Sequence, residues 1–195
     1  MNLMYPEPGP YDLRFRLGWI PVRVVPGFWL VNGAIGLGLT QAGGAAMFFV
    51  WVAAALASIL IHELAHVMVG RQFGAHGEMV LTCFGGLAPG SADVFHRWQR
   101  VLVYLAGPAS QLALAAILLA VLRQTDLKLI TVGEYEEMPL IAEVAAVLIG
   151  INILWPLINL IPAPPLDGGM VMKELLGRSA ARDPWEQDPN WWKGD

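Results

Sequence analysis

Two histidines and a glutamate stand close together in an apolar stretch, in the order His62-Glu63-Leu64-Ala65-His66. On a helix, residues i and i+4 share a face, so the two imidazoles can bind one metal ion. The Glu63 carboxylate lies one position further round the helix, where it can take a proton from a water on that ion. Zinc suits this chemistry because it lowers the pKa of its water to about 7. The pattern therefore predicts a hydrolytic metal site.

A structural alternative exists for the same residues, in which both histidines bond to neighbouring helices and Glu63 is neutral. The motif lies in the last third of a nearly continuous apolar stretch, Ala45–Gly70. At the centre of a membrane helix an ionisable side chain costs about 2.5–3.5 kcal/mol, so such residues are rare without a function. We therefore favour the metal site.

A third protein ligand is expected, because catalytic zinc usually has three of them and one open position. Asp167 follows a proline-rich stretch, Pro162–Pro165, and is followed by Gly168-Gly169, so a continuous helix is interrupted here. Irregular backbone at membrane depth is tolerated where it is buried in protein or lines a watery cavity, which is where a ligand would lie. Asp167 could equally cap a short helix at 170–176.

Other candidate ligands are less favourable. Glu143 is a rival carboxylate, but it lies near the opposite membrane face from the histidine pair, roughly 30 Å away, so we expect an interfacial or inter-helix hydrogen-bonding role. His76 and His96 are expected to be surface histidines in a loop. Cys83 is expected to be a small apolar side chain, and a single cysteine excludes an intramolecular disulfide and a cysteine-rich metal site.

Apolar segments must position these residues. The chain has 195 residues, 56% of them hydrophobic and only 14% charged, against about 25% charged in a typical soluble domain. A spanning helix needs about 20 residues. The shortest segment, Phe28–Thr40, therefore either crosses the membrane with the help of its flanking residues or is re-entrant. Barrel-strand alternation is absent, which leaves helices as the spanning form. The four segments are Phe28–Thr40, Ala45–Gly70, Val101–Leu122 and Pro139–Ile161.

We therefore predict an all-α membrane protein, a bundle of about four transmembrane segments. The run Gly77–Phe84 is rich in strand formers and ends at Gly85-Gly86, which predicts a short membrane-associated β-hairpin or re-entrant loop. We expect one domain over residues 1–177, with its core at 45–177, and a polar tail at 178–195.

The distribution of basic residues predicts the orientation. With the N-terminus in the cytoplasm, the opposite side keeps only Arg123 and Lys128 of the 12 Lys and Arg residues. The first 26 residues lack the apolar core of a cleavable signal peptide. We predict an integral, multi-pass protein of the inner membrane of a prokaryotic cell, with both termini cytoplasmic. The net charge of -4 gives no basic surface for nucleic acid.

The motifs together resemble the site-2 protease family of intramembrane zinc metalloproteases. The resemblance covers roughly residues 45–177, and its order and approximate spacing agree. It rests on the His62–His66 helix, Ala106-Gly107-Pro108, the stretch from Asn159 to Gly169 that contains Asp167, and Phe84-Gly85-Gly86, which is similar to the glycine pair closing the family's hairpin.

The resemblance implies that His62, His66 and Asp167 bind one zinc ion per chain and that Glu63 is the general base. It also implies that the run before Phe84 offers a strand edge to an unwound substrate, a membrane-anchored protein or peptide in the lipid bilayer. The residues expected beside the substrate are Phe84, Gly85, Gly86 and Asn159.

Some features depart from the family pattern. Gln111 stands where the family usually has an asparagine thought to polarise the substrate carbonyl; glutamine offers the same donor on a longer arm. An inter-helix hydrogen bond is the alternative for Gln111. Asn159 could bond backbone or substrate near the zinc, or cap the broken segment. The chain shows no inserted peptide-binding domain and no nucleotide-sensing domain, so we expect a minimal core.

We predict an intramembrane zinc metalloprotease that hydrolyses peptide bonds of membrane-anchored substrates in regulated intramembrane proteolysis. One alternative is a catalytically silent relative that binds transmembrane helices, although the presence of Glu63 argues against it. The other is a membrane metal transporter, which would spread its ligands along a path and show repeat symmetry. The sequence specifies no oligomeric state.

Overall fold

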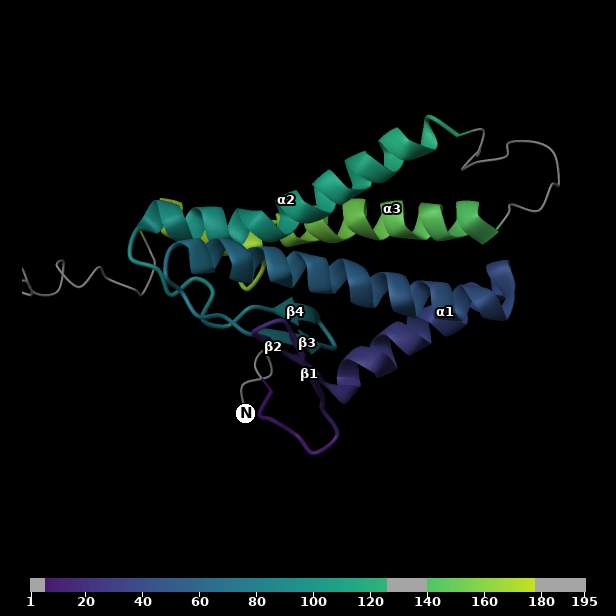
Figure 1. The fold of residues 1–195 in the computed structure, drawn as a ribbon, viewed down its shortest axis with the longest axis horizontal. Coiled ribbons are helices and arrows are strands. Elements are labelled where there is room, and N and C mark those ends of the chain that lie inside the picture. The colour runs from purple at the N-terminus through teal and green to yellow at the C-terminus, as the bar shows by residue number, and fades with distance from the viewer. Residues whose placement is uncertain (1–5, 126–139, 178–195) are drawn as a thin grey trace, which may run out of the picture.

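Three long helices packed side by side, with a small sheet near one end, form the protein (Figure 1). The computed structural model describes residues 6–125 and 140–177. The predicted fold class, a helical membrane bundle with a short β-hairpin, is confirmed, although the sheet is larger than predicted. The helices are α1 (Pro26–Gln72), α2 (Arg97–Leu122), α3 (Leu140–Asn159) and the short α4 (Asp167–Leu175).

Helix α1 consists of two arms. Gly44 has a φ of 70° and interrupts the helical backbone, so the first arm, residues 26–43, turns back into the second arm, residues 44–72 (Figure 1). Glycine readily adopts a positive φ because it has no β-carbon. A β-carbon on Gly36 would lie 3.1 Å from the Phe48 ring, so this glycine also allows the two arms to approach closely. The arms correspond to the first two predicted apolar segments.

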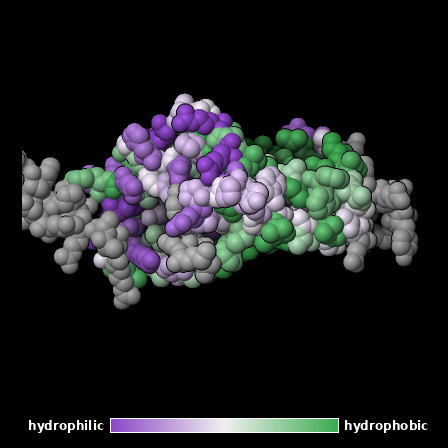
Figure 2. Space-filling view, turned by 90° about the horizontal axis from the view of Figure 1, so that it is seen from below, coloured by the Kyte–Doolittle hydropathy of each residue, from purple (hydrophilic) through white to green (hydrophobic). Residues whose placement is uncertain are grey.

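Three helical segments of the described chain are long and apolar enough to cross a bilayer, namely Gly44–Gln72, Arg97–Leu122 and Leu140–Asn159. The first arm of α1 is not among them, in line with the short length of Phe28–Thr40. Only 22–28% of each most apolar window is buried inside the protein, so most of these side chains face outward, where lipid would cover them. Figure 2 shows hydrophobic residues gathered over one half of the molecule and hydrophilic residues over the other.

The sheet joins two hairpins that are far apart in the sequence. The strands lie in the order β1-β2-β3-β4; each hairpin is antiparallel, whereas β2 and β3 are parallel, with Val22 opposite Met79. Parallel neighbours need a crossover connection, and α1 provides it. The β3–β4 hairpin was predicted, but β1 and β2 were not. The strands are β1 (Leu13–Leu17), β2 (Ile20–Val24), β3 (Met79–Thr82) and β4 (Gly85–Leu87).

The main core lies between the sheet and the second arm of α1. All four residues of β3 are buried, and the inner face of β2 is buried with them. Burial of apolar side chains here fixes the sheet beside the last turns of α1, where the histidine motif lies. The buried residues of this core are Ile20, Val22, Val24, Phe28, Ile59, Val67, Met79 and Leu81.

Several predictions fall outside the described residues. Lys128 and the tail at 178–195 belong to the ranges that the structure does not describe. The predicted domain boundaries at 1–177 and the core at 45–177 therefore stay predictions.

Candidate metal centre

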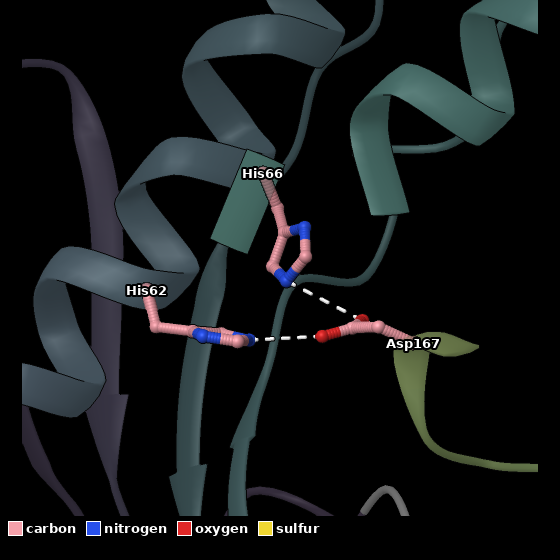
Figure 3. A group of neighbouring side chains, drawn as sticks. All are labelled: His62, His66 and Asp167. Carbon is pink, nitrogen blue, oxygen red and sulfur yellow. Dashed lines mark hydrogen bonds and ion pairs between the residues drawn. The ribbon is translucent and has the colours of Figure 1, made fainter. Parts of the chain in front are cut away.

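Asp167 lies directly opposite the two histidines of α1 (Figure 3). Nε2 of His62 is 3.0 Å from Oδ2 of Asp167, and Nε2 of His66 is 3.5 Å from Oδ1. Ligands 2.0–2.1 Å from a tetrahedral ion are about 3.3 Å from one another, so these separations fit one ion held between the three side chains. The three ligand atoms all lie within 4.8 Å of one another.

The structure corrects the alternative role of Asp167 as a helix cap. α4 begins at Asp167 itself rather than at residue 170, and its N-cap residue, Leu166, makes no side-chain capping bond. Burial raises the pKa of Asp167, but hydrogen bonds with His62 and His66 outweigh burial, so the pKa falls below its ordinary value. Oδ2 faces His62 and Oδ1 faces His66, so both carboxylate oxygens are directed at the imidazoles.

The second nitrogen of each imidazole is bonded on the side away from Asp167. Nδ1 of His66 donates to the carbonyl of Val103 at 2.6 Å, and Nδ1 of His62 donates to Oε1 of Gln111 at 2.9 Å. Such partners fix the orientation and tautomer of a ligating histidine. Both rings therefore present Nε2 toward the carboxylate.

Glycines allow the backbone to approach this centre. A β-carbon on Gly107 would collide with the rings of His62 and His66, so only glycine lets α2 pass this close to them. This explains the glycine of the Ala106-Gly107-Pro108 motif in terms of space. Pro108 lies inside α2, which changes direction along its length in Figure 1, as expected for a helix with an internal proline.

Glu63 is 3% exposed and lies against β4. A β-carbon on Gly86 would collide with its carboxylate, so Gly86 and Glu63 are in close contact. The neighbouring Gly85 has a φ of 122° and lies against Trp155 of α3. The glycine pair therefore packs beside the predicted base and beside the third membrane helix.

The prediction that the run before Phe84 offers a free strand edge to the substrate is wrong. The run before Phe84 is β3, and both of its edges are already paired, to β2 and to β4. The edges of the described sheet are β1 and β4, and β4 contains Gly86, which is in close contact with Glu63. Phe84 lies in the turn between β3 and β4 and is 76% exposed.

Gln111 does not occupy the position that an oxyanion donor requires, and the bond that Asn159 makes is the predicted alternative of a bond to backbone. Gln111 is 0% exposed; it accepts from His62 and donates from Nε2 to the carbonyl of Ser58 at 3.2 Å, so its donor is directed away from the carboxylate side of the ring. The geometry favours the inter-helix alternative. Asn159 ends α3 and donates to the carbonyl of Trp155 at 3.2 Å, a bond to its own helix.

The remaining candidates lie apart from the metal centre. Glu143 is in the first turn of α3, and His76 is exposed and donates to the carbonyl of Gly74. His96 is the N-cap residue of α2, with a reciprocal capping box to Gln99. Cys83 is half-buried next to the start of α1. None of them belongs to the metal-ligand group of the described residues.

Sequence analysis missed a buried ion pair that holds α4 in place. Nε of Arg100 donates to Oε2 of Glu174 at 2.9 Å, and the guanidinium also donates to the carbonyls of Val94 and Phe95. The pair connects the start of α2 to the helix that begins with Asp167. An arginine and a glutamate 74 positions apart give no recognisable spacing signal, so the pair could not be read from the sequence.

No family model matches this chain, but several known proteins are similar to it. Rip3 of Mycobacterium tuberculosis is 34% identical over 82% of this chain and 37% of its own length. sll0528 of Synechocystis is 33% identical over 80% of this chain and 42% of its own length. The protein named zinc metalloprotease MJ0392, of Methanocaldococcus jannaschii, is 27% identical over 86% of this chain and 46% of its own length.

The chain thus spans about two fifths of the length of these relatives. A solved structure also matches its fold. The site-2 protease from Methanocaldococcus jannaschii superposes with a TM-score of 0.66 and 25% identity, covering 88% of this chain and 74% of that one. The sequence relatives, the shared fold and the motifs on α1, α2 and α4 lead to one conclusion: this chain has the fold and the metal-site motifs of the site-2 protease family.

Proposed function

We propose that this protein is an intramembrane zinc metalloprotease that cleaves membrane-anchored proteins or peptides. The observation that carries the proposal is the convergence of His62, His66 and Asp167 beside a buried glutamate, Glu63, in a helix apolar enough to span a bilayer. Ionisable groups at such depth are rarely present without a function.

The donor set fits one zinc ion per chain. Two imidazole nitrogens and a carboxylate oxygen form a common ligand set of catalytic zinc, which keeps a fourth position open for water or substrate. His62, His66 and Asp167 supply these three donors, and Gly107 leaves the space that the imidazoles need. The name of the relative MJ0392, a zinc metalloprotease, is consistent with this choice of metal.

Glu63 carries the proton through the reaction. When bound, zinc acts as a Lewis acid and brings the pKa of its water to about 7. The Glu63 carboxylate takes a proton from the attacking water as a new C–O bond forms at the scissile carbonyl carbon. It then gives the proton to the departing amide nitrogen as the C–N bond breaks, and the products are a carboxylic acid and an amine, which become a carboxylate and an ammonium group when the acid's remaining proton moves to the amine.

The substrate reaches Glu63 as an extended strand. A helical membrane segment hides its peptide bonds, so it must unwind before hydrolysis, and pairing to a strand edge satisfies the freed amides. β4 supplies this edge in our proposal, because Gly86 contacts Glu63. Phe84, exposed at the adjoining turn, would contact the substrate side chains.

The arrangement of the sheet supports cytoplasmic termini. Since β2 pairs with β3, residues 13–24 and 79–87 lie on one side of the membrane, and the ion pair of Arg100 with Glu174 brings α4 to the same side. Five of the 12 Lys and Arg residues belong to these segments, namely Arg14, Arg16, Arg23, Arg100 and Lys173, which favours the cytoplasm for that side. The relatives come from bacteria and an archaeon, in line with a prokaryotic inner membrane.

The Glu63→Gln variant tests the proposed function. We expect it to retain one zinc ion per chain and to lose peptide cleavage, because the amide cannot accept the proton. Cells that produce the variant should accumulate uncleaved membrane proteins that the wild-type protein removes, as measured by comparing the two membrane proteomes. Glu143→Gln, the same change at the start of α3, is the matched control and should behave as wild type. Full cleavage by Glu63→Gln would refute the assigned base.

A further inference from the structure

Gln111 is a fully buried amide whose two ends are both bonded to α1. Its Oε1 lies 2.9 Å from Nδ1 of His62, and its Nε2 lies 3.2 Å from the carbonyl oxygen of Ser58. Ser58 and His62 are four positions apart on α1, so they occupy one face of that helix. The single side chain of Gln111 therefore contacts a proposed metal ligand and a fixed backbone group one turn away.

The Ser58 carbonyl determines which way the amide of Gln111 lies. A carbonyl oxygen can only accept, so the NH₂ end of Gln111 must face Ser58. The oxygen end then faces Nδ1 of His62, and since Oε1 can only accept, Nδ1 must carry a hydrogen. A neutral imidazole with its hydrogen on Nδ1 keeps its lone pair on Nε2, the nitrogen that lies 3.0 Å from Asp167.

We propose that Gln111 is a positioning residue that holds His62 in the Nδ1–H tautomer and in the orientation needed to bind the metal. The proposal rests on the proposed metal centre and assigns Gln111 no contact with substrate. It replaces the predicted role of Gln111 as an oxyanion donor with a role that acts through His62. A partner of this kind typically changes metal affinity about 10–100-fold when it is removed.

The two histidines differ in how their tautomers are fixed. His66 donates from Nδ1 to the backbone carbonyl of Val103, a group that no substitution removes. His62 has a side chain in the equivalent place. Of the two histidines, therefore, His62 is the one whose tautomer depends on a side chain, that of Gln111 on α2. Substitution of Gln111 can therefore measure this contribution.

Asn152 provides a matched comparison. It is a fully buried amide on α3, and its Nδ2 donates to the hydroxyl of Ser58 at 2.9 Å and to the carbonyl of Leu148 at 2.8 Å. It joins α3 to the same residue of α1 that Gln111 contacts, but its hydrogen bonds go to Ser58 and Leu148 and not to His62. Asn152→Leu therefore removes an inter-helix bond of the same chemical kind without removing the partner of a metal ligand.

The experiment measures zinc binding to the full chain in detergent, starting from metal-free protein and using a competing chelator. Gln111→Met keeps the length of the side chain but removes the acceptor, so we expect zinc affinity to fall about 10–100-fold. Gln111→Glu should bind within about threefold of wild type, because a neutral carboxylic acid can accept from Nδ1 with one oxygen and donate to the Ser58 carbonyl with the other. Asn152→Leu should also retain wild-type affinity.

Cobalt substitution provides a spectroscopic readout that a purely structural role would not change. The visible bands of bound Co²⁺ report ligand geometry, so they should shift in Gln111→Met and stay unchanged in Gln111→Glu and Asn152→Leu. Equal zinc affinity of Gln111→Met and wild type would overturn the proposal. An equal loss in Gln111→Met and Gln111→Glu would also overturn it, because the lost function would then be the inter-helix bond to Ser58.

Two other outcomes can be distinguished from a failure of this proposal: a wild-type chain that binds no zinc, and a Gln111→Met variant that does not fold. If the wild-type chain binds no zinc, the proposed function fails before the role of Gln111 is tested. If Gln111→Met does not fold, the ¹⁵N NMR spectrum of histidine-labelled, zinc-loaded wild type decides the question. The proposal requires the His62 signal to show a hydrogen on Nδ1 and metal on Nε2. The reverse assignment would contradict it.

Discussion

The two hairpins of the sheet are built from the same kind of element but contact different parts of the protein. The β3–β4 hairpin is buried along β3 and lies against the predicted base, with Gly86 in contact with Glu63. The β1–β2 hairpin has an exposed outer strand, β1, and is held by ion pairs of Asp12 with Arg14 and Arg23. The inner hairpin therefore lies beside the candidate metal centre, whereas the outer one extends and stabilises the sheet.

The two hairpins should therefore respond differently to substitution. The inner hairpin has no room for a larger side chain beside Glu63, whereas the outer hairpin is held by ion pairs and has free space at its turn. On the inner hairpin, a methyl group added at Gly86 meets the carboxylate of Glu63, the base in our proposal. On the outer hairpin, the turn glycine, Gly18, has no neighbouring atom within 4 Å of an added β-carbon. We therefore expect substitutions in β3–β4 to change catalysis and equivalent substitutions in β1–β2 to change only stability.

The largest expected effect comes from Gly86→Ala. The added β-carbon would collide with the Glu63 carboxylate and its stem, so the base must move. Displacement by about 1 Å can cost about 100-fold in rate, and we expect a loss of this order in kcat/KM with zinc content unchanged. Gly18→Ala is the control in the outer hairpin: its φ of 59° makes alanine cost about 1–2 kcal/mol of stability, with activity retained. Equal activity of both variants would remove the distinction between the hairpins.

A smaller effect is expected at the two turns, each of which exposes an aromatic side chain. Phe84 in the β3–β4 turn is 76% exposed, and we propose that it contacts the substrate. Phe84→Ala removes this apolar contact and should raise KM about tenfold. It should leave kcat unchanged, because the contact is equally strong with the bound substrate and with the transition state. The outer turn carries Trp19, which lies over Arg71. Steady-state kinetics of Trp19→Ala should match wild type, and a similar rise in KM there would contradict the assignment.

The smallest effect is expected at Asp12, the acid that holds the outer hairpin. Burial raises the pKa of Asp12, but the Gly9 amide and the Arg23 guanidinium outweigh burial and hold the pKa below its ordinary value of 3.8. A depressed pKa in the folded state stabilises that state above pH 3.8, and this stabilisation disappears as the pH falls through the lowered pKa.

Asp12→Asn should therefore weaken the hairpin by about 0.5–1 kcal/mol at neutral pH, because a pair near the surface is screened by solvent. Amide hydrogen exchange of residues 13–24 measures the change locally. The difference between variant and wild type should vanish in acid. A difference that persists unchanged below the folded pKa would show that the carboxylate charge is not its cause.

Much of the metal centre was predictable from the sequence because it depends on local spacing. His62 and His66 share a helical face by periodicity alone, and the apolar surroundings distinguish them from surface histidines. Asp167 followed from a proline-rich break and from the family resemblance. The inner hairpin was recognisable from a strand-forming run that ends at two glycines.

The rest depends on contacts between distant segments, for which periodicity has no signal. The outer hairpin joins the sheet by pairing β2 with β3 across the whole length of α1. The role of Gln111 depends on which groups of α1 lie within reach of its amide, and the role of Asp167 depends on α4 bringing its carboxylate to the histidines. The buried pair of Arg100 and Glu174 belongs to the same class.

X-ray absorption at the zinc edge, together with metal content, tests the central claim most directly. We expect one zinc ion per wild-type chain, with two imidazole nitrogens at about 2.0–2.1 Å and a carboxylate oxygen at about 2.0–2.2 Å. Asp167→Ala should lose the oxygen ligand and most of the bound zinc. An Asp167→Ala protein that kept the wild-type zinc content and an unchanged spectrum would contradict a site formed by His62, His66 and Asp167.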